Sequence, residues 1–166
     1  MKQIPQVNFA EFIESFPIVE LPVTLTDDAS QTFSVENKPF SQAILEQYLI
    51  PLEADEHDEF TEYLPCFAIP ETHQFFAVVY WKAGLMNYQY ILATFSLKAE
   101  LIDKKVIAGT FSDGQSLIQS VATIDPDWEI IVLSGQSPAS SEVHLAAAKS
   151  TTQTFEILPE GQIAAL

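Results

Sequence analysis

The sequence contains no arginine, and its 7 basic residues, all lysines, stand against 23 acidic residues. The formal net charge is therefore −16 at pH 7. Affinity for nucleic acids comes largely from lysine and arginine side chains that neutralise phosphates, and arginine is the usual bidentate ligand of phosphate and carboxylate groups. We therefore expect no binding to nucleic acid, no nucleotide chemistry and no binding to anionic membrane surfaces.

Cysteine and glycine are also scarce. The single cysteine, Cys66, cannot form an intramolecular disulfide, and its neighbours Pro65 and Phe67 predict a small buried hydrophobic residue. Only 5 glycines occur, and none of them builds a glycine-rich phosphate-binding loop. We expect no cofactor.

Long apolar runs are missing as well. No segment approaches the roughly 20 apolar residues of a membrane-spanning helix. The N-terminal segment "MKQIPQVNFAEFIESF" has no continuous apolar core and does not resemble a signal peptide. We expect a cytoplasmic protein with no membrane contact, although a chain from which a signal peptide had been removed would look the same.

What the chain does contain is a high apolar content, 48% over 166 residues, which suits one globular domain spanning 1–166. The first part, 1–62, is acidic and predicts helices and loops. Asn8 is suited to cap a helix that ends before Pro17, and a second helix is expected from about Ser41 to Leu49, with Pro51 ending it. The segment "DDASQTFSVENK" predicts a loop, with room for a short strand around Phe33.

The second part, 63–166, is rich in aromatic and β-branched residues separated by turn residues, which predicts an antiparallel β part. The segment "FFAVVYW" is apolar on both alternating faces, so we expect a central strand with the N-terminal helices over one face. The ambiguous segment 140–150 fits helix or strand, and we favour extended structure. The predicted fold class is α+β, with one or two N-terminal helices packed on an antiparallel meandering β-sheet of about six or seven strands.

The segment "EADEHDEFTEY" concentrates acidic residues around His57. The carboxylates are Glu53, Asp55, Glu56, Asp58, Glu59 and Glu62. A calcium loop needs a glycine and alternating ligands, and a zinc helix needs a second histidine four residues away; the segment has neither. Burying several like charges is costly. We therefore predict a solvated face that serves as a contact surface, with no metal ligands.

Catalytic motifs are weak throughout. The histidines His57, His73 and His144 are far apart, and Gly135-Gln136-Ser137 lacks the closing glycine and the strand–turn–helix context of a nucleophile elbow. We predict no catalytic residues and a non-enzymatic role. A small hydrolase remains an alternative, and it would require a cleft in which a histidine meets a carboxylate.

These features favour a non-enzymatic acidic protein-interaction module. An inhibitor or immunity-type protein that binds a basic partner through the six carboxylates fits the size and charge. The alternative is a small-ligand-binding protein with an aromatic-lined pocket built from Trp81, Tyr88 and Tyr90. Alternating aromatic residues on paired strands are, however, more often core residues than pocket residues.

Overall fold

The computed structural model describes residues 7–85, 87–112, 114–138 and 149–166. The helices are α1 (Phe9–Glu14), α2 (Ala29–Glu36), α3 (Gln42–Ile44), the π-helix η1 (Leu45–Leu49) and α4 (Ile50–Leu52). The strands are β1 (Val23–Leu25), β2 (Glu62–Ala68), β3 (Phe75–Ala83), β4 (Asn87–Ser96), β5 (Leu101–Ser112), β6 (Ser116–Ile124), β7 (Glu129–Pro138), β8 (Lys149–Ile157) and β9 (Ile163–Ala165).

Eight strands form an antiparallel meander in chain order from β2 to β9, and β1 pairs with β6 beside it. The α+β prediction with an antiparallel sheet is confirmed. The sheet has more strands than the six or seven expected from the sequence. Both β1 and β9 are only three residues long, too short to leave an alternating pattern in the sequence.

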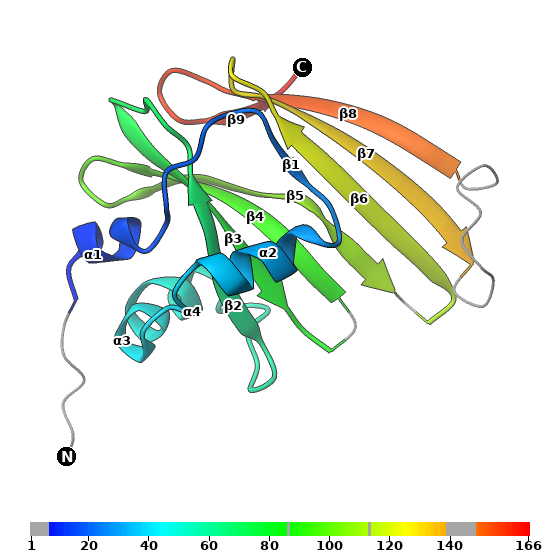
Figure 1. Ribbon diagram of the computed structural model, residues 1–166, viewed down its shortest axis with the longest axis horizontal. Coiled ribbons are helices and arrows are strands. Elements are labelled where there is room, and N and C mark those ends of the chain that lie inside the picture. The colour runs from blue at the N-terminus through cyan, green and yellow to red at the C-terminus, as the bar shows by residue number, and fades with distance from the viewer. Residues whose placement is uncertain (1–6, 86, 113, 139–148) are drawn as a thin grey trace.

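The sheet changes direction at β5. This strand pairs with β4 along most of its length but with β6 only through Gly109–Ser112. Further along β6, β1 takes the place that β5 has left, with Val23–Leu25 opposite Ala122–Ile124. The strands β2–β4 and β6–β8 therefore form two groups that β5 connects, and the helices lie beside the first group (Figure 1).

Buried side chains occupy both faces of β3 and β4. One cluster joins residues of β2–β5 with residues of β6–β8, for example Val79 and Leu92 with Ile124 and Ile130. A second cluster brings Phe12 of α1 and the helical residues Ile44 and Leu49 against the other face, where Tyr80, Ile91 and Phe95 lie. The prediction that "FFAVVYW" forms a strand buried on both sides, with the helices over one face, is confirmed.

The prediction for the segment around Phe33 is wrong, because these residues form α2 rather than a loop or strand. Ala29 and Phe33, one helical turn apart, pack against the first core cluster. The ring centroid of Phe33 lies 5.9 Å from that of Phe67. Tertiary packing therefore stabilises a helix whose own sequence has little helical pattern.

Both predicted helices are present, but their first and last residues differ from the predicted ones. Asn8 caps α1, because its Oδ1 accepts a hydrogen bond from the Glu11 N–H at 2.9 Å. The second helix runs from Gln42 to Leu52 and passes Pro51. Pro51 lies in the first turn of α4, directly after the wider turns of η1, where a missing N–H is tolerated.

Most of the ambiguous segment 140–150 lies outside the described residues, and β8 begins at Lys149. Among the helices of the described residues, none is both long and apolar enough to span a bilayer.

Candidate functional site

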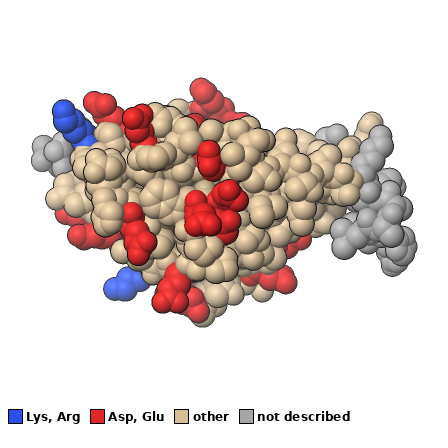
Figure 2. All heavy atoms as spheres, turned by 90° about the horizontal axis from the view of Figure 1, so that it is seen from above, with Lys and Arg blue, Asp and Glu red and all other residues tan. Residues whose placement is uncertain are grey.

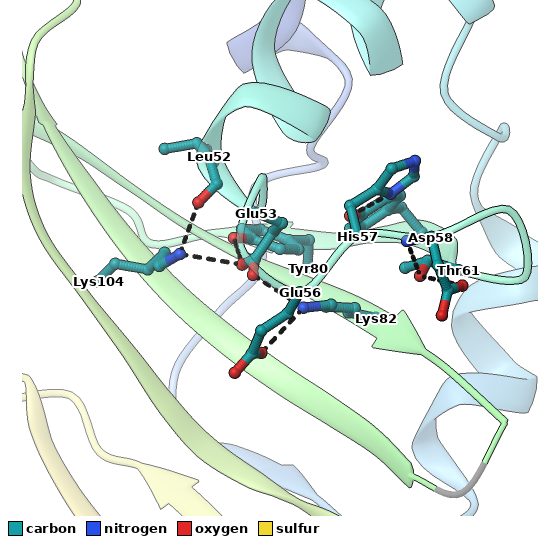
Figure 3. A network of polar contacts seen from close by, with 10 residues as sticks. Leu52, Glu53, Glu56, His57, Asp58, Thr61, Tyr80, Lys82 and Lys104 are labelled. Atoms are coloured by element: carbon teal, nitrogen blue, oxygen red, sulfur yellow. Dashed lines mark hydrogen bonds and ion pairs between the residues drawn. The ribbon is translucent and has the colours of Figure 1, made fainter.

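The acidic segment lies between α4 and β2, and the structure divides it into two parts. Glu53 and Glu56 face the sheet and contact lysines, whereas Asp58 and Thr61 belong to a separate turn that leads into β2 at Glu62 (Figure 3). We call residues 55–62 the acidic loop.

Glu53 is buried, with only 5% of its surface exposed. Its Oε1 accepts a hydrogen bond from the Tyr80 hydroxyl at 2.6 Å and lies 3.3 Å from the Lys104 Nζ. Its Oε2 lies 3.0 Å from the Nζ of Lys82, which is itself 5% exposed. The prediction that all six carboxylates lie on a solvated face is wrong for Glu53, since two lysines and a tyrosine offset the cost of its burial.

These contacts decide the protonation state of the group. Burial raises the pKa of Glu53, but hydrogen bonds from Tyr80 and Lys82 and the charges of Lys104 and Lys82 outweigh it, so the pKa lies below its ordinary value. Burial and the neighbouring Glu53 carboxylate raise the pKa of the Tyr80 hydroxyl. Glu53 is therefore ionised and Tyr80 neutral at pH 7.

Both lysines also hold the chain around Glu53. The Nζ of Lys82 lies 3.2 Å from Oε2 of Glu56, and the Nζ of Lys104 donates to the Leu52 carbonyl at 2.8 Å. The network attaches the end of α4 and the start of the acidic loop to β3 and β5. With its polar atoms engaged by neighbours from the same chain, this inner part attaches the acidic segment to the sheet.

The outer part of the loop is ordered by Asp58. Its Oδ1 accepts hydrogen bonds from the Phe60 N–H at 2.8 Å and from the Thr61 hydroxyl at 3.0 Å. The Thr61 Oγ1 accepts in turn from the Asp58 N–H at 3.0 Å. A short polar side chain that bonds its own backbone in this way fixes a turn without help from the core.

The turn displays an aromatic ring among carboxylates. Phe60 is 55% exposed, and Asp55, Asp58, Glu59 and Glu62 are exposed around it in the chain. Within the described part of the chain, no lysine forms an ion pair with these four carboxylates. Carboxylates also occur on the face shown in Figure 2, so negative charge alone does not single out the loop.

A groove of about 470 Å³ lies beside the loop. Its apolar lining includes Pro39, Phe40, Leu45, Ile50 and Tyr63, and its acidic lining consists of Asp58, Glu59 and Glu62. An apolar lining with carboxylates beside it matches a lysine or arginine side chain, whose stem is apolar and whose end is cationic.

His57 also lines this groove, and among the described residues it has no acidic hydrogen-bond partner. Its Nδ1 is 3.0 Å from the Tyr63 hydroxyl, and the two rings are stacked with centroids 5.7 Å apart. His73 is exposed, and His144 lies outside the described residues. Among the described residues, no group of three or more histidine, cysteine, aspartate or glutamate side chains is arranged to hold a metal ion.

The three aromatic residues predicted to line a pocket lie close together on β3 and β4, where Trp81 is the register partner of Tyr90. Tyr90 is a core residue whose hydroxyl donates to the Thr26 carbonyl at 3.1 Å, and burial raises its pKa to about 12. Trp81 packs against the same core, with its ring 6.2 Å from that of Tyr88. Tyr88 lines a groove of about 150 Å³ whose other walls come from β4 to β8. Trp81 and Tyr90 both pack in the core, and the buried Trp81 Nε1 has no hydrogen-bond partner among the described residues.

The structure also places Cys66 and the segment Gly135-Gln136-Ser137, both considered from the sequence. Cys66 is fully buried, as predicted, and burial raises the pKa of its thiol. Gly135-Gln136-Ser137 lies within β7, with no strand–turn–helix context.

Comparison with family models, with curated proteins and with solved structures finds no match for this chain.

Sequence reasoning missed the role of Phe60 and the partners of Glu53. Phe60 is the one large apolar residue within "EADEHDEF", and an isolated aromatic residue in a charged run is itself a signal of exposure. Lys82 follows seven consecutive apolar residues of β3, and a lysine in that position calls for a buried acidic partner. The sequence alone does not say which acid that is.

Proposed function

We propose that this chain is a non-enzymatic protein-interaction module that binds a basic partner through the acidic loop. The observation that carries the proposal is Phe60, which is exposed at an ordered turn. The carboxylates on either side of it form no ion pair with a lysine of the described chain. An exposed aromatic residue supplies the apolar contact area typical of binding hot spots. The surrounding carboxylates attract a cationic surface and raise the rate of encounter.

The groove beside the loop supports a basic partner in particular. A lysine or arginine side chain that enters along Leu45 and Ile50 would bury its stem and bring its charge to Glu59 and Glu62. Because the loop is already ordered before a partner binds, less conformational entropy is lost on association. An inhibitor or immunity-type protein acting on a basic enzyme in the cytoplasm is the biological role that we propose for this surface.

The test is a pull-down from the source lysate with the intact chain, at about 0.05 M and about 0.5 M salt. The test variant replaces Asp55, Glu59 and Glu62 by Asn, Gln and Gln, and leaves Asp58 to hold the turn. The control variant replaces three exposed carboxylates elsewhere by Gln, namely Glu36, Glu100 and Glu160.

We expect a basic protein that the intact chain and the control retain at low salt and that the test variant loses. Its on-rate should fall about tenfold or more in the test variant, because steering depends on local charge. A separate Phe60→Ala variant should mainly raise the off-rate. Equal retention by the test and control variants, with the same salt dependence, would refute the proposal.

A further inference from the structure

The edges of the sheet differ in how they are protected from other strands. The outer edge of β2 is covered within the chain: the Asn37 Nδ2 donates to the carbonyls of Pro65 and Cys66 at 2.8 and 2.9 Å. The Ala68 N–H, on the same strand, donates to the Pro17 carbonyl at 2.8 Å. Proline within the strand and side-chain bonds to its carbonyls prevent a foreign strand from pairing there.

The first half of β5 is protected by charge. Its residues Leu101–Val106 pair with β4, whereas β6 joins only the far end of the strand. Asp103, Lys104 and Lys105 stand in succession along this half. Consecutive charged side chains on an edge strand discourage pairing with a second chain.

The outer edge of β8 is less protected, because Lys149 at its start is the one charged residue outside the stretch that β9 covers. It pairs with β7 on one side, but β9 covers only Phe155–Ile157 on the other side. The Thr154 carbonyl, which accepts from the Leu166 N–H at 2.9 Å, points to this outer side. Because backbone groups alternate along an antiparallel strand, Ser150 and Thr152 present their N–H and C=O groups to the same side. Among the described residues no backbone group pairs with them there.

The side chains along this bare edge include no carboxylate. Ser150, Thr151, Thr152 and Gln153 are all exposed, Lys149 precedes them at the start of the strand, and the stretch contains no proline. The chain as a whole has a net charge of −16.

We infer that the bare edge of β8 binds the same edge of a second copy of this chain. The two strands run antiparallel about a two-fold axis, with Ser150 of each copy opposite Thr152 of the other. This register uses the outward N–H and C=O groups of both residues in four hydrogen bonds and places Thr151 beside its own mate at the axis. The edge suits a second copy, because its uncovered residues 149–153 include no carboxylate, so two strongly acidic molecules meet there with little local repulsion. The inference is independent of the acidic loop.

The experiment measures the mass of the intact chain by light scattering and sedimentation over a range of concentrations, at low and high salt. We expect a monomer–dimer equilibrium that salt strengthens, since screening reduces the repulsion between the two negative molecules. Thr152→Pro removes the outward N–H and leaves the bonds to β7 in place. It should raise the dimer Kd about 30-fold, because two donors are lost from one symmetric interface.

A matched variant separates edge pairing from packing of the exposed sheet face. Leu133, which lies opposite Thr152 on β7, is 55% exposed, and Leu133→Lys alters that face without touching the edge of β8. Dimerisation should survive Leu133→Lys. A dimer that is lost with Leu133→Lys but kept with Thr152→Pro would overturn the inference, as would a monomer at all concentrations and salt levels.

A cross-link tests the register and does not depend on the proline variant folding. In the inferred dimer the two Thr151 Cα atoms form a non-hydrogen-bonded pair about 4.5 Å apart, within disulfide range. Thr151→Cys should therefore give an oxidised covalent dimer, whereas Thr152→Cys, offset by two residues from its mate, should not. Cys66 is buried and does not compete. Equal cross-linking of both variants would refute the register.

Discussion

At the scale of single residues, Glu53 and Lys82 each make the burial of the other possible. Removing the carboxylate by Glu53→Ala would leave the Lys82 ammonium buried without its partner at 3.0 Å. A broken buried pair typically costs about 3–5 kcal/mol, so we expect the free energy of unfolding to fall by about 3 kcal/mol in urea denaturation.

The neighbouring acid provides the control for this prediction. Glu56 contacts the same Lys82 nitrogen, but its side chain is 68% exposed. Glu56→Ala should therefore cost less than about 1 kcal/mol. If the two substitutions destabilise the protein equally, burial of Glu53 is not what makes its ion pair important.

At the scale of elements, the close approach of β5 to β4 depends on Gly109. Its φ is 144°, and a Cβ atom built there would lie 2.2 Å from the Tyr88 carbonyl oxygen and 2.9 Å from the Gln89 Cα. Both neighbours are backbone atoms of β4, so they cannot yield without moving the strand. Gly109→Ala should lower the free energy of unfolding by about 3 kcal/mol or more.

Gly114, in the turn after β5, supplies the comparison. Its φ is 88°, but a Cβ atom there would have no neighbour within 4 Å. Gly114→Ala should therefore cost only the backbone term, about 1–2 kcal/mol. Thermal or urea unfolding of both variants gives the difference, and similar losses would show that β4 does not restrict Gly109.

The elements also show what could be predicted from sequence. The capped helix at Asn8 and the doubly apolar strand β3 follow from local pattern, and both are present. The helix α2 could not be predicted, because Asp28 before it makes no side-chain cap and its packing depends on Phe67, far along the chain. The acidic loop was predicted from composition, but the burial of Glu53 depends on Lys82 and Lys104, 29 and 51 residues away.

At the scale of the whole molecule, the charge of −16 opposes compaction. Raising the salt from about 0.01 M to 0.3 M shortens the Debye length from about 30 Å to below 10 Å and should screen this repulsion. We expect Tm to rise by about 2–4 °C, which corresponds to about 1 kcal/mol for a chain of this size. Calorimetry at low protein concentration measures this without a contribution from self-association.

A charge variant gives the control. Replacing Glu36, Glu100 and Glu160 by Lys changes the charge by two at each site and brings the net charge from −16 to −10. The same salt step should then raise Tm by less. An unchanged salt response would mean that the repulsion is local rather than global.

The pairing of β1 with β6 has a consequence for how the chain assembles during synthesis. Most strands pair with the next strand along the chain, so each hairpin can close soon after it leaves the ribosome. In contrast, Thr24 reaches its partner Thr123 across 99 residues. The strand β1 is made before any meander strand but can dock only after β6 has emerged, so the N-terminal segment is completed late. Until then the edge of β6 that β1 covers, and the apolar residue Leu25, stay available to chaperones and to wrong partners.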